Sequence, residues 1–416
     1  MKKYYKRLTE RILTRKLEAE GGVIIEGPRF VGKSTMALQL AKSDIRLDES
    51  EEILEIARLT PKSILRGATP RLIDEWQLAP NIWNVLRHEI DQRQEVGQFI
   101  LTGSATPTDD VTRHSGAGRI GRVRLRTMSL YESNNSEKIV NFKNLFDREA
   151  QKDLSGYGGL TIEDYCEQIV RGGWPSLINM PIDQAIEAVD DYVDNVTRLN
   201  LADDENETDP NRMRGLIQAI SRNIATEASK EKITREAGIA TTVTSTKYID
   251  RLSRVFVLEN LPAWRTHIRS TIQMRVKPKW HFVDPSIAVS SLGLSPNRLL
   301  NDLPATGFFF ESLAIRDLRI YASMIGGEVF YYRDSSGLEV DAIVQLRDGR
   351  WSAFEIKLGG KDRIVEGVGN LRRMFNRLTD KKQADMMSLN VITGGNVSMH
   401  NAEKDVNVIS LGHLWV

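Results

Sequence analysis

One run, GPRFVGKS at residues 27–34, constrains the fold of this chain more than any other feature. It follows the apolar residues 22–25 and precedes residues 35–41, whose composition favours a helix. A strand, a loop with the spacing GxxxxGK[ST] and a helix, in that order, form the phosphate-binding P-loop. Backbone N–H groups of such a loop converge on phosphate oxygens, and the helix directs its positive end toward them. The run therefore predicts a binding site for a nucleoside triphosphate.

Two side chains of the loop have expected roles. Lys33 is expected to reach the β- and γ-phosphates, and the hydroxyl of Ser34 to ligate Mg²⁺. A glycine turn that happens to carry a lysine is the alternative, and the strand and helix patterns on either side count against it. ATP and Mg²⁺ are therefore the expected cofactors. The candidate nucleotide-binding residues are Gly27, Pro28, Arg29, Phe30, Val31, Gly32, Lys33, Ser34 and Thr35.

A second predicted strand, residues 71–74, ends in the acidic pair Asp74 and Glu75. Asp74 is expected to hold Mg²⁺ through water, and Glu75 to polarise the attacking water. An acidic strand end that faces solvent is the alternative. The distance of about 40 residues from Lys33 suits one or two intervening β-α units, which favours the catalytic interpretation.

A third predicted strand, residues 98–104, ends in small polar residues. The carboxyl ends of parallel strands meet at one crevice, so a hydroxyl of Thr102 or Ser104 is placed to sense the γ-phosphate. Thr102 is the preferred sensor, although a threonine at this point also suits a helix cap.

Residues 111–126 contain five arginines and no acid. An arginine finger, supplied in cis or by a neighbouring subunit, would stabilise transition-state charge. Arg119 follows a glycine-containing loop and is the better candidate. The alternating Arg122, Arg124 and Arg126 are typical of the solvent face of a strand. The fifth arginine of the segment is Arg113.

Taken together, these segments resemble the AAA-type P-loop ATPases of prokaryotes, and more narrowly those followed by domain of unknown function 4143 (DUF4143). The resemblance rests on the P-loop, on DEWQ at 74–77 with Pro80, on FILTGSA at 99–105 and on AGR at 117–119. It implies an α/β sheet of order 5-1-4-3-2 with helices on both faces, and ATP hydrolysis. Lys33, Asp74, Glu75, Thr102 and Arg119 are then the candidate catalytic residues.

The middle of the chain has a helical pattern that includes a helix-turn-helix at residues 233–252, with residues 255–258 as a wing strand. Such a module binds DNA in some proteins and serves as a packing or partner element in others. Residues 263–280 interleave basic and aromatic side chains, which suits phosphate contacts and base stacking, or else a solvated hairpin. The residues in question are Arg265, Arg269, Arg275, Lys277, Lys279, Trp264 and Trp280.

The last part of the chain has a second constellation of charged residues. Asp341 lies in one predicted strand, Glu355 and Lys357 alternate on the next, and Glu311 lies on a preceding helix. Carboxylate oxygens suit Mg²⁺, and Lys357 is placed to position or activate a water. The arrangement resembles the PD-(D/E)xK nuclease superfamily, which implies a metal site formed by Glu311, Asp341 and Glu355. A descendant of that fold that keeps these acids for structure is the alternative.

Bulk properties set the remaining expectations. The 416 residues predict a leading helix (1–20), an AAA-type ATP-binding domain (21–132), a linker (133–160), a helical and winged-helix region (161–300) and a nuclease-like α/β domain (301–416). A net charge of +1 neither favours nor excludes a nucleic-acid partner. The single cysteine, Cys166, excludes an internal disulfide. No apolar stretch approaches the roughly 20 residues that are needed to span a bilayer, and no signal-peptide pattern is seen. A cytoplasmic protein that does not associate with a membrane is therefore expected.

Two functions follow from this organisation. The first is an ATPase whose hydrolysis controls a nuclease-like domain that acts on or binds DNA or RNA. The second is an ATPase switch whose C-terminal domain only binds a protein partner and cleaves nothing. A nucleotide sensor without hydrolysis is a third, which Glu75 counts against. The sequence does not decide whether the chain forms a homo-oligomer, because AAA-type ATPases work as rings or as monomers.

Overall fold

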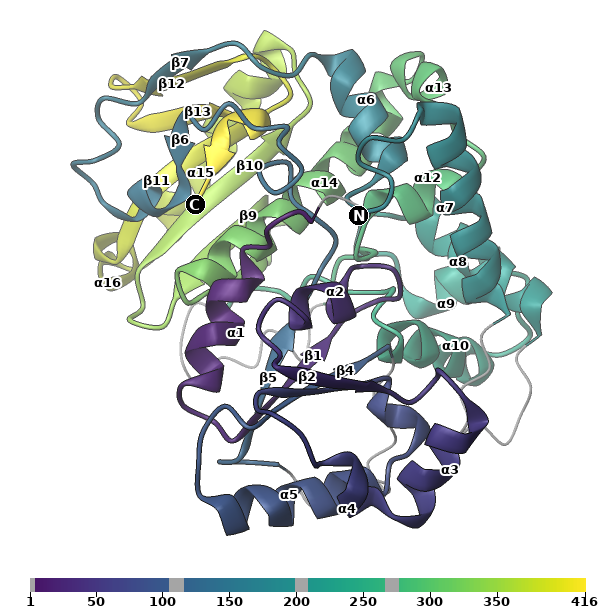
Figure 1. Cartoon of the computed structure of the whole chain (residues 1–416). Coiled ribbons are helices and arrows are strands. Elements are labelled where there is room, and N and C mark those ends of the chain that lie inside the picture. Colours follow the sequence, from purple (N-terminus) through teal and green to yellow (C-terminus); the bar gives the residue numbers. More distant parts are fainter. Residues whose placement is uncertain (1–3, 105–115, 199–208, 266–276) are drawn as a thin grey trace. The chain divides into compact units, whose positions relative to one another are not determined.

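The computed structural model describes residues 4–104, 116–198, 209–265 and 277–416 (Figure 1). Two compact units make up this part of the chain. The first unit runs to Thr127 and includes Asp250–Val257, and the second comprises the other described residues. Arg113, Arg269 and Arg275, which the sequence singled out, lie outside the described residues.

The first unit contains a parallel five-stranded sheet of order β2-β3-β4-β1-β5. Read from the other edge, this is the predicted 5-1-4-3-2 order, so that prediction is confirmed. Its strands are β1 (Gly22–Glu26), β2 (Ser43–Arg46), β3 (Arg71–Asp74), β4 (Phe99–Gly103) and β5 (Ile120–Arg124). Its helices are α1 (Thr9–Leu17), α2 (Lys33–Ala37), α3 (Glu51–Leu59), α4 (Pro61–Ile64), α5 (Ile82–Arg93) and the 3₁₀ turn η1 (Trp76–Leu78).

Both faces of this sheet are buried, because alternate strand residues enter two separate apolar clusters. Ile24 and Leu101 pack with residues of α3, α4 and α5 on one face. Val23 and Ile100 pack with residues of α1 and α2 on the other. Strands of a parallel sheet covered on both faces are apolar along their length, as the run at residues 22–25 predicted.

The helices of the second unit include the predicted helix-turn-helix. Helix α9 (Lys230–Glu236) is followed by Gly238, whose φ of 67° reverses the chain, and by α10 (Thr242–Arg254), whose last residues belong to the first unit. Antiparallel bridges join Leu258 to Phe282 and Leu261 to Lys279. The other helices are α6 (Ile162–Arg171), α7 (Ile182–Thr197), α8 (Pro210–Arg222), α12 (Pro285–Ser291), α13 (Pro296–Leu300), α14 (Leu303–Met324), α15 (Lys361–Arg377) and α16 (Asp380–Ala384).

A mixed seven-stranded sheet of order β7-β12-β13-β11-β10-β9-β8 completes the second unit. Helix α14 contacts β8, β9 and β10, and α15 contacts β9, β10 and β11. The strands are β7 (Ser155–Tyr157), β8 (Gly327–Arg333), β9 (Glu339–Leu346), β10 (Trp351–Lys357), β11 (Met386–Thr393), β12 (Val397–Asn401) and β13 (Val406–Ser410). A small pair, β6 (Val140–Asn141) and β14 (Leu414–Trp415), and the 3₁₀ turns η2 (Phe142–Phe146) and η3 (Leu411–His413) accompany it.

The prediction that residues 133–160 are a linker is corrected by this sheet. Strand β7 pairs with β12, and β6 pairs with β14. Phe142 is fully buried against Phe354 of β10. The polar Asn-Asn-Ser and Gly-Tyr-Gly-Gly stretches indicated a surface loop, but the apolar residues between them pack into the core.

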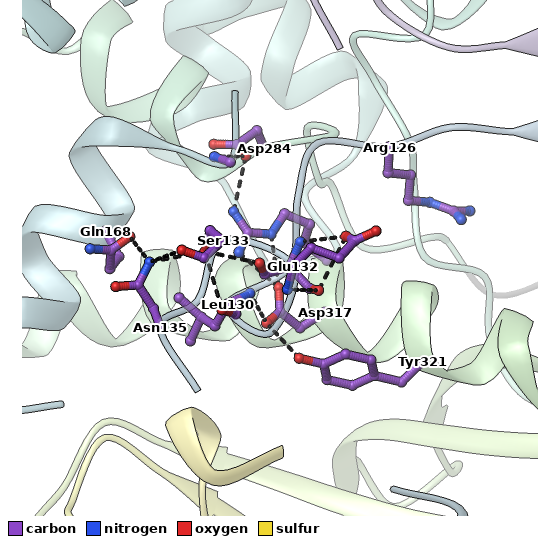
Figure 2. Close-up of polar contacts among 12 residues, drawn as sticks. Arg126, Leu130, Glu132, Ser133, Asn135, Gln168, Asp284, Asp317 and Tyr321 are labelled. Carbon is purple, nitrogen blue, oxygen red and sulfur yellow. Dashed lines mark hydrogen bonds and ion pairs between the residues drawn. The ribbon is translucent and has the colours of Figure 1, made fainter. Parts of the chain in front are cut away.

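A buried ionic network joins α14 to two distant segments of the second unit (Figure 2). The guanidinium of Arg316 contacts Asp284 at 3.1 Å and Asp317 at 2.8 Å. Asp317 accepts the backbone N–H of Leu130 at 2.9 Å and the hydroxyl of Tyr321 at 3.4 Å. Asp284 also begins α12 by accepting the N–H of Ser286. These groups are buried away from water, so their charges must be balanced within the network.

Candidate functional site

The loop between β1 and α2 has the close approaches that a P-loop needs. A Cβ at Gly27 would lie 2.2 Å from the carbonyl oxygen of Leu125. Gly32 precedes α2 with a φ of 90°, a left-handed conformation that glycine adopts without strain. Both glycines of the motif are therefore required by the backbone path.

Lys33 is buried at the start of α2, with 5 % of its surface exposed. Its Nζ donates to the carbonyl oxygens of Gly27 at 3.0 Å and Pro28 at 2.8 Å. Burial lowers the pKa of its ammonium group from 10.5 to about 8, against the opposing effect of Glu75 and Asp74. The loop thus surrounds the ammonium group of Lys33 and offers it only neutral carbonyl oxygens as hydrogen-bond acceptors.

Asp74, at the end of β3, joins two hydroxyls from neighbouring parts of the first unit. Its Oδ1 accepts a hydrogen bond from Ser34 at 2.8 Å and another from Thr102 of β4. The three residues come together because β3, β4 and β1 are adjacent and parallel. The hydroxyl of Ser34 and the carboxylate of Asp74 form an oxygen donor set, which fits Mg²⁺.

Glu75 follows Asp74 in a left-handed conformation, with a φ of 54°. A left-handed residue other than glycine costs about 1–3 kcal/mol, and it persists because its surroundings hold it there. Its carboxylate accepts hydrogen bonds from the side chains of Gln77 and, at 3.1 Å, Ser104. Glu75 and Asp74 both act on the charge of Lys33, since each favours its ammonium form.

Arg119 lies at the opposite end of the sheet from the P-loop. The next residue, Ile120, pairs with Gly22, the first residue of β1, whereas the P-loop follows the last residue of that strand. Arg119 also pairs with Asp91 of α5 at 2.5 Å. A role for Arg119 as a finger in its own chain is therefore wrong.

The neighbouring arginines of β5 lie partly as predicted. Arg122 is half exposed and pairs with Glu26, which agrees with a solvent face. Arg124 lies over the ring of Phe256 at 4.1 Å. Both residues belong to the first unit.

Arg7 contacts the P-loop and was missed by the sequence analysis. It is 4 % exposed and donates to the carbonyl oxygens of Val31 at 2.9 Å and Arg126 at 2.7 Å. The basic run at the N-terminus gives no signal that one of its arginines is buried.

The second unit brings together the charged residues predicted in its C-terminal part. Lys357 of β10 contacts Glu355 at 2.6 Å and Asp341 of β9 at 3.4 Å. Asp341 also accepts the N–H of Ile356 at 2.8 Å. Glu311 of α14 belongs to the same cluster through Lys279, whose Nζ lies 2.8 Å from Glu311 and 3.5 Å from Asp341.

Burial and mutual repulsion shift the carboxylates of this cluster in different directions. Burial raises the pKa of Glu311 to about 8 and that of Glu355 well above its usual range. Burial opposes ionisation of Asp341 as well, but Lys279 and Lys357 outweigh it and lower its pKa. The same carboxylates raise the pKa of Lys279 although burial opposes its charge.

The predicted metal site of Glu311, Asp341 and Glu355 is not assembled. Within the described ranges, no three His, Cys, Asp or Glu side chains come together in positions that could hold a metal ion. The ammonium of Lys279 lies between the carboxylates instead, and it also contacts Glu339 at 2.6 Å. A metal in this position does not fit the residues present, and the prediction is corrected on that ground.

The aromatic side chains of residues 263–280 are not available for base stacking. Trp264 and Trp280 are each 2 % exposed, and Lys279 is 1 % exposed. The indole N–H of Trp264 donates to Gln345, and that of Trp280 donates to the carbonyl of Ala228. Alternation of basic and aromatic residues predicted an exposed surface, but these three face the core. Among the described basic residues of this segment, Arg265 and Lys277 are exposed.

Three protein families match successive parts of the chain. The AAA domain family matches residues 20–134, a domain of unknown function (DUF8612) matches residues 162–298, and a domain of unknown function (DUF4143) matches residues 306–413. The chain therefore carries an AAA-type P-loop domain and a DUF4143 domain, as the sequence resemblance implied.

Two mycobacterial proteins resemble the chain over most of its length. They are the uncharacterized protein Rv2008c of Mycobacterium tuberculosis and the uncharacterized protein Mb2031c of Mycobacterium bovis. Each is 25% identical over 354 residues, which span 83% of this chain and 72% of the relative.

Solved structures with partial similarity include two ATPases of Pyrococcus. The Walker-type ATPase PABY2304 of Pyrococcus abyssi is 13% identical, with 70% of this chain and 96% of that chain covered and a TM-score of 0.42. The STAND protein PH0952 of Pyrococcus horikoshii, which has a tetratricopeptide repeat sensor, is 13% identical, with 78% and 50% covered and a TM-score of 0.26. At these scores the fold assignment rests on the strand order of the chain itself. Within the described residues, no helix is both long and apolar enough to cross a membrane.

Proposed function

We propose that the first unit binds ATP with Mg²⁺ and hydrolyses it. The observation that carries this proposal is the single carboxylate oxygen of Asp74 that accepts both Ser34 and Thr102. In a P-loop enzyme these are the positions that ligate the metal and sense the γ-phosphate. Their hydrogen bonds hold the site in order before a nucleotide enters.

Each residue then has one task. The backbone N–H groups of residues 29–32 and the ammonium of Lys33 bind the phosphates, so Lys33 exchanges the carbonyls of Gly27 and Pro28 for phosphate oxygens. Ser34 and Asp74 would hold Mg²⁺, which neutralises charge on the phosphate oxygens. Glu75 orients the water and accepts its proton, and Thr102 contacts the γ-phosphate.

The test is steady-state ATP hydrolysis by the full chain with Lys33→Ala and Glu75→Gln. Lys33→Ala is expected to lose binding and turnover. Glu75→Gln is expected to keep ATP binding and lose about 10²- to 10⁴-fold in kcat, the usual contribution of a general base. Lys62→Ala, an exposed lysine of α4, is the matched control and should behave as the parent. Turnover by Lys33→Ala equal to that of the parent would overturn the proposal.

We further propose that the ATPase controls the DUF4143 domain, which acts on or binds nucleic acid. The order α14, β8, β9, β10, α15, β11, with β10 and β11 parallel, supports a likeness of this domain to the PD-(D/E)xK fold. The alternative output is a protein partner, bound by a domain that cleaves nothing. Hydrolysis measured with single- and double-stranded DNA and RNA distinguishes the two. Stimulation supports the nucleic-acid output, and an unchanged rate supports the protein-partner switch.

A further inference from the structure

Lys279 enters the carboxylate cluster from outside the strands that carry it. Its backbone is fixed by two hydrogen bonds to Leu261, at 2.9 and 3.0 Å, in the segment that precedes α12. The side chain reaches Glu311 of α14 and Glu339 and Asp341 of β9. A residue of the middle region therefore supplies the cation for acids of the C-terminal domain.

The contacts of Lys279 match the capacity of an ammonium group. Three carboxylates, at 2.8, 2.6 and 3.5 Å, surround a group that has three N–H donors and no acceptor. The side chain is 2 % exposed, so water does not take part. The lysine is thus satisfied by the cluster alone.

The second lysine of the cluster completes the pairing. Lys357 contacts Glu355 at 2.6 Å and Asp341 at 3.4 Å. With Lys279 in place, each of the four carboxylates lies beside an ammonium. Glu355 is held least tightly of the four: its Oε1 atom accepts no hydrogen bond from the described residues, and burial raises the pKa of its carboxyl well above the usual range.

A divalent cation would have to compete with Lys279 for the same oxygens. Mg²⁺ requires oxygen ligands at about 2.0–2.1 Å in near-octahedral order, so the ammonium would have to leave. Displacing a buried lysine from its partners leaves an uncompensated charge, and two cations held side by side repel strongly in a medium of low dielectric constant. Both effects oppose metal binding.

We propose that the ammonium of Lys279 takes the place of a divalent cation in this cluster, so that the C-terminal domain keeps its acidic residues without a metal. The domain then binds its target without metal-dependent phosphodiester cleavage. This inference does not rest on ATP hydrolysis, because the cluster lies wholly in the second unit.

The test is Mn²⁺ binding, measured by electron paramagnetic resonance on the full chain without nucleotide. An Asp74→Asn background reduces binding at the nucleotide site, and Asp341→Asn is compared within that background. We expect the same number of bound Mn²⁺ ions with and without Asp341→Asn. A site that is present in the background protein and lost with Asp341→Asn would overturn the inference.

A second comparison tests whether the ammonium of Lys279 is what keeps Mn²⁺ out of the cluster. Lys279→Met keeps an unbranched apolar side chain and removes the charge, so it is expected to gain one Mn²⁺ per chain. Adding Asp341→Asn should abolish that gain, and Lys277→Met, an exposed lysine nearby, should show none. A folded Lys279→Met protein without the new site would contradict the proposal. If Lys279→Met does not fold, the Asp341→Asn comparison still decides.

Discussion

Thr102 donates a hydrogen bond to the Oδ1 atom of Asp74 from the neighbouring parallel strand. Because the same oxygen accepts Ser34 at 2.8 Å, the direction of the carboxylate is set by hydroxyls on two sides. A hydrogen bond to a charged group contributes about 1.5–3 kcal/mol, which corresponds to about 10- to 150-fold in a rate. Thr102→Val keeps the shape and removes the donor, so we expect kcat for ATP to fall within that range.

Thr102→Ser is the matched variant, since it keeps the hydroxyl and removes only a methyl group. It should retain most of the activity in the same steady-state assay. A Thr102→Val enzyme with the kcat of the parent would show that this hydroxyl has no part in turnover.

A methyl group at Gly27 is expected to disrupt the P-loop. The added Cβ would lie 2.2 Å from the carbonyl oxygen of Leu125, which is backbone and cannot rotate away. Overpacking of this kind costs about 1–3 kcal/mol and moves the backbone. Gly27→Ala should therefore lower the melting temperature and weaken ATP binding, measured by calorimetry.

Gly369→Ala serves as the control for that substitution. Gly369 lies in α15, and a Cβ there meets no heavy atom within 4 Å. Alanine in a helix interior is more stable than glycine by about 0.5–1 kcal/mol, so this variant should melt slightly higher and bind ATP normally. Equal ATP affinity in both variants would contradict the steric explanation.

ATP binding should become weaker above pH 8 because of Lys33. Burial lowers the pKa of this ammonium from 10.5 to about 8 in the nucleotide-free protein, and phosphate oxygens would favour the charged form. Above pH 8 the neutral lysine must therefore take up a proton when ATP binds. The Kd is expected to rise by up to about tenfold per pH unit, as one linked proton requires.

Calorimetry at pH 8.5 in two buffers with different ionisation enthalpies measures that proton directly. The same pKa shift also affects the folding stability of the protein without ATP, in the opposite direction with pH. Since the unfolded chain keeps the usual pKa, it binds more protons than the folded chain between pH 8 and 10.5, and this group makes stability rise with pH there. An enthalpy of ATP binding that is identical in the two buffers would exclude the linkage.

The grouping of Ser34, Asp74 and Thr102 could be predicted from the sequence because its signals are local. The P-loop is a continuous run, and Asp74 and Thr102 each lie at the end of a buried strand, so the parallel order alone brings them together. A role for Arg119 as a finger in its own chain failed because Arg119 lies just before β5 rather than after it, whereas a role toward a neighbouring subunit stays a prediction. Whether a loop residue precedes or follows a strand depends on where that strand begins and ends, and local sequence patterns predict these bounds poorly.

The carboxylate cluster shows where sequence reasoning reaches its limit. Glu311, Asp341, Glu355 and Lys357 were found from their spacing, and the structure groups them. Lys279 and Glu339 were not expected there, because a buried lysine is recognisable only from its partners, and these lie 32 to 62 residues away along the chain. Arg7 at the P-loop was missed for the same reason.

Cys166 should resist thiol reagents in the folded protein. Its side chain is fully buried in α6, and burial raises the pKa of its thiol to about 11. The thiolate is the reactive form, so labelling at pH 8 requires opening of the helix. Because Cys166 is the only cysteine, labelling of the native chain should be at least about tenfold slower than in denaturant. Equal rates with and without denaturant would mean that the helix opens freely.

Removing Arg316 should destabilise the second unit more than removing an exposed arginine. Its guanidinium is 2 % exposed and lies between Asp284 and Asp317, so Arg316→Leu leaves two buried carboxylates without their cation. Breaking a buried pair in this way costs about 3–5 kcal/mol.

Arg214→Leu is the matched control, because Arg214 pairs with Asp194 at 2.6 Å while 45% of its side chain is exposed. Surface pairs contribute about 0–1 kcal/mol, so this variant should unfold near the parent. Urea unfolding followed by tryptophan fluorescence compares the two. Equal midpoints for both variants would show that Asp284 and Asp317 take up protons or other partners when the arginine is gone, and that the network in Figure 2 does not depend on its central cation.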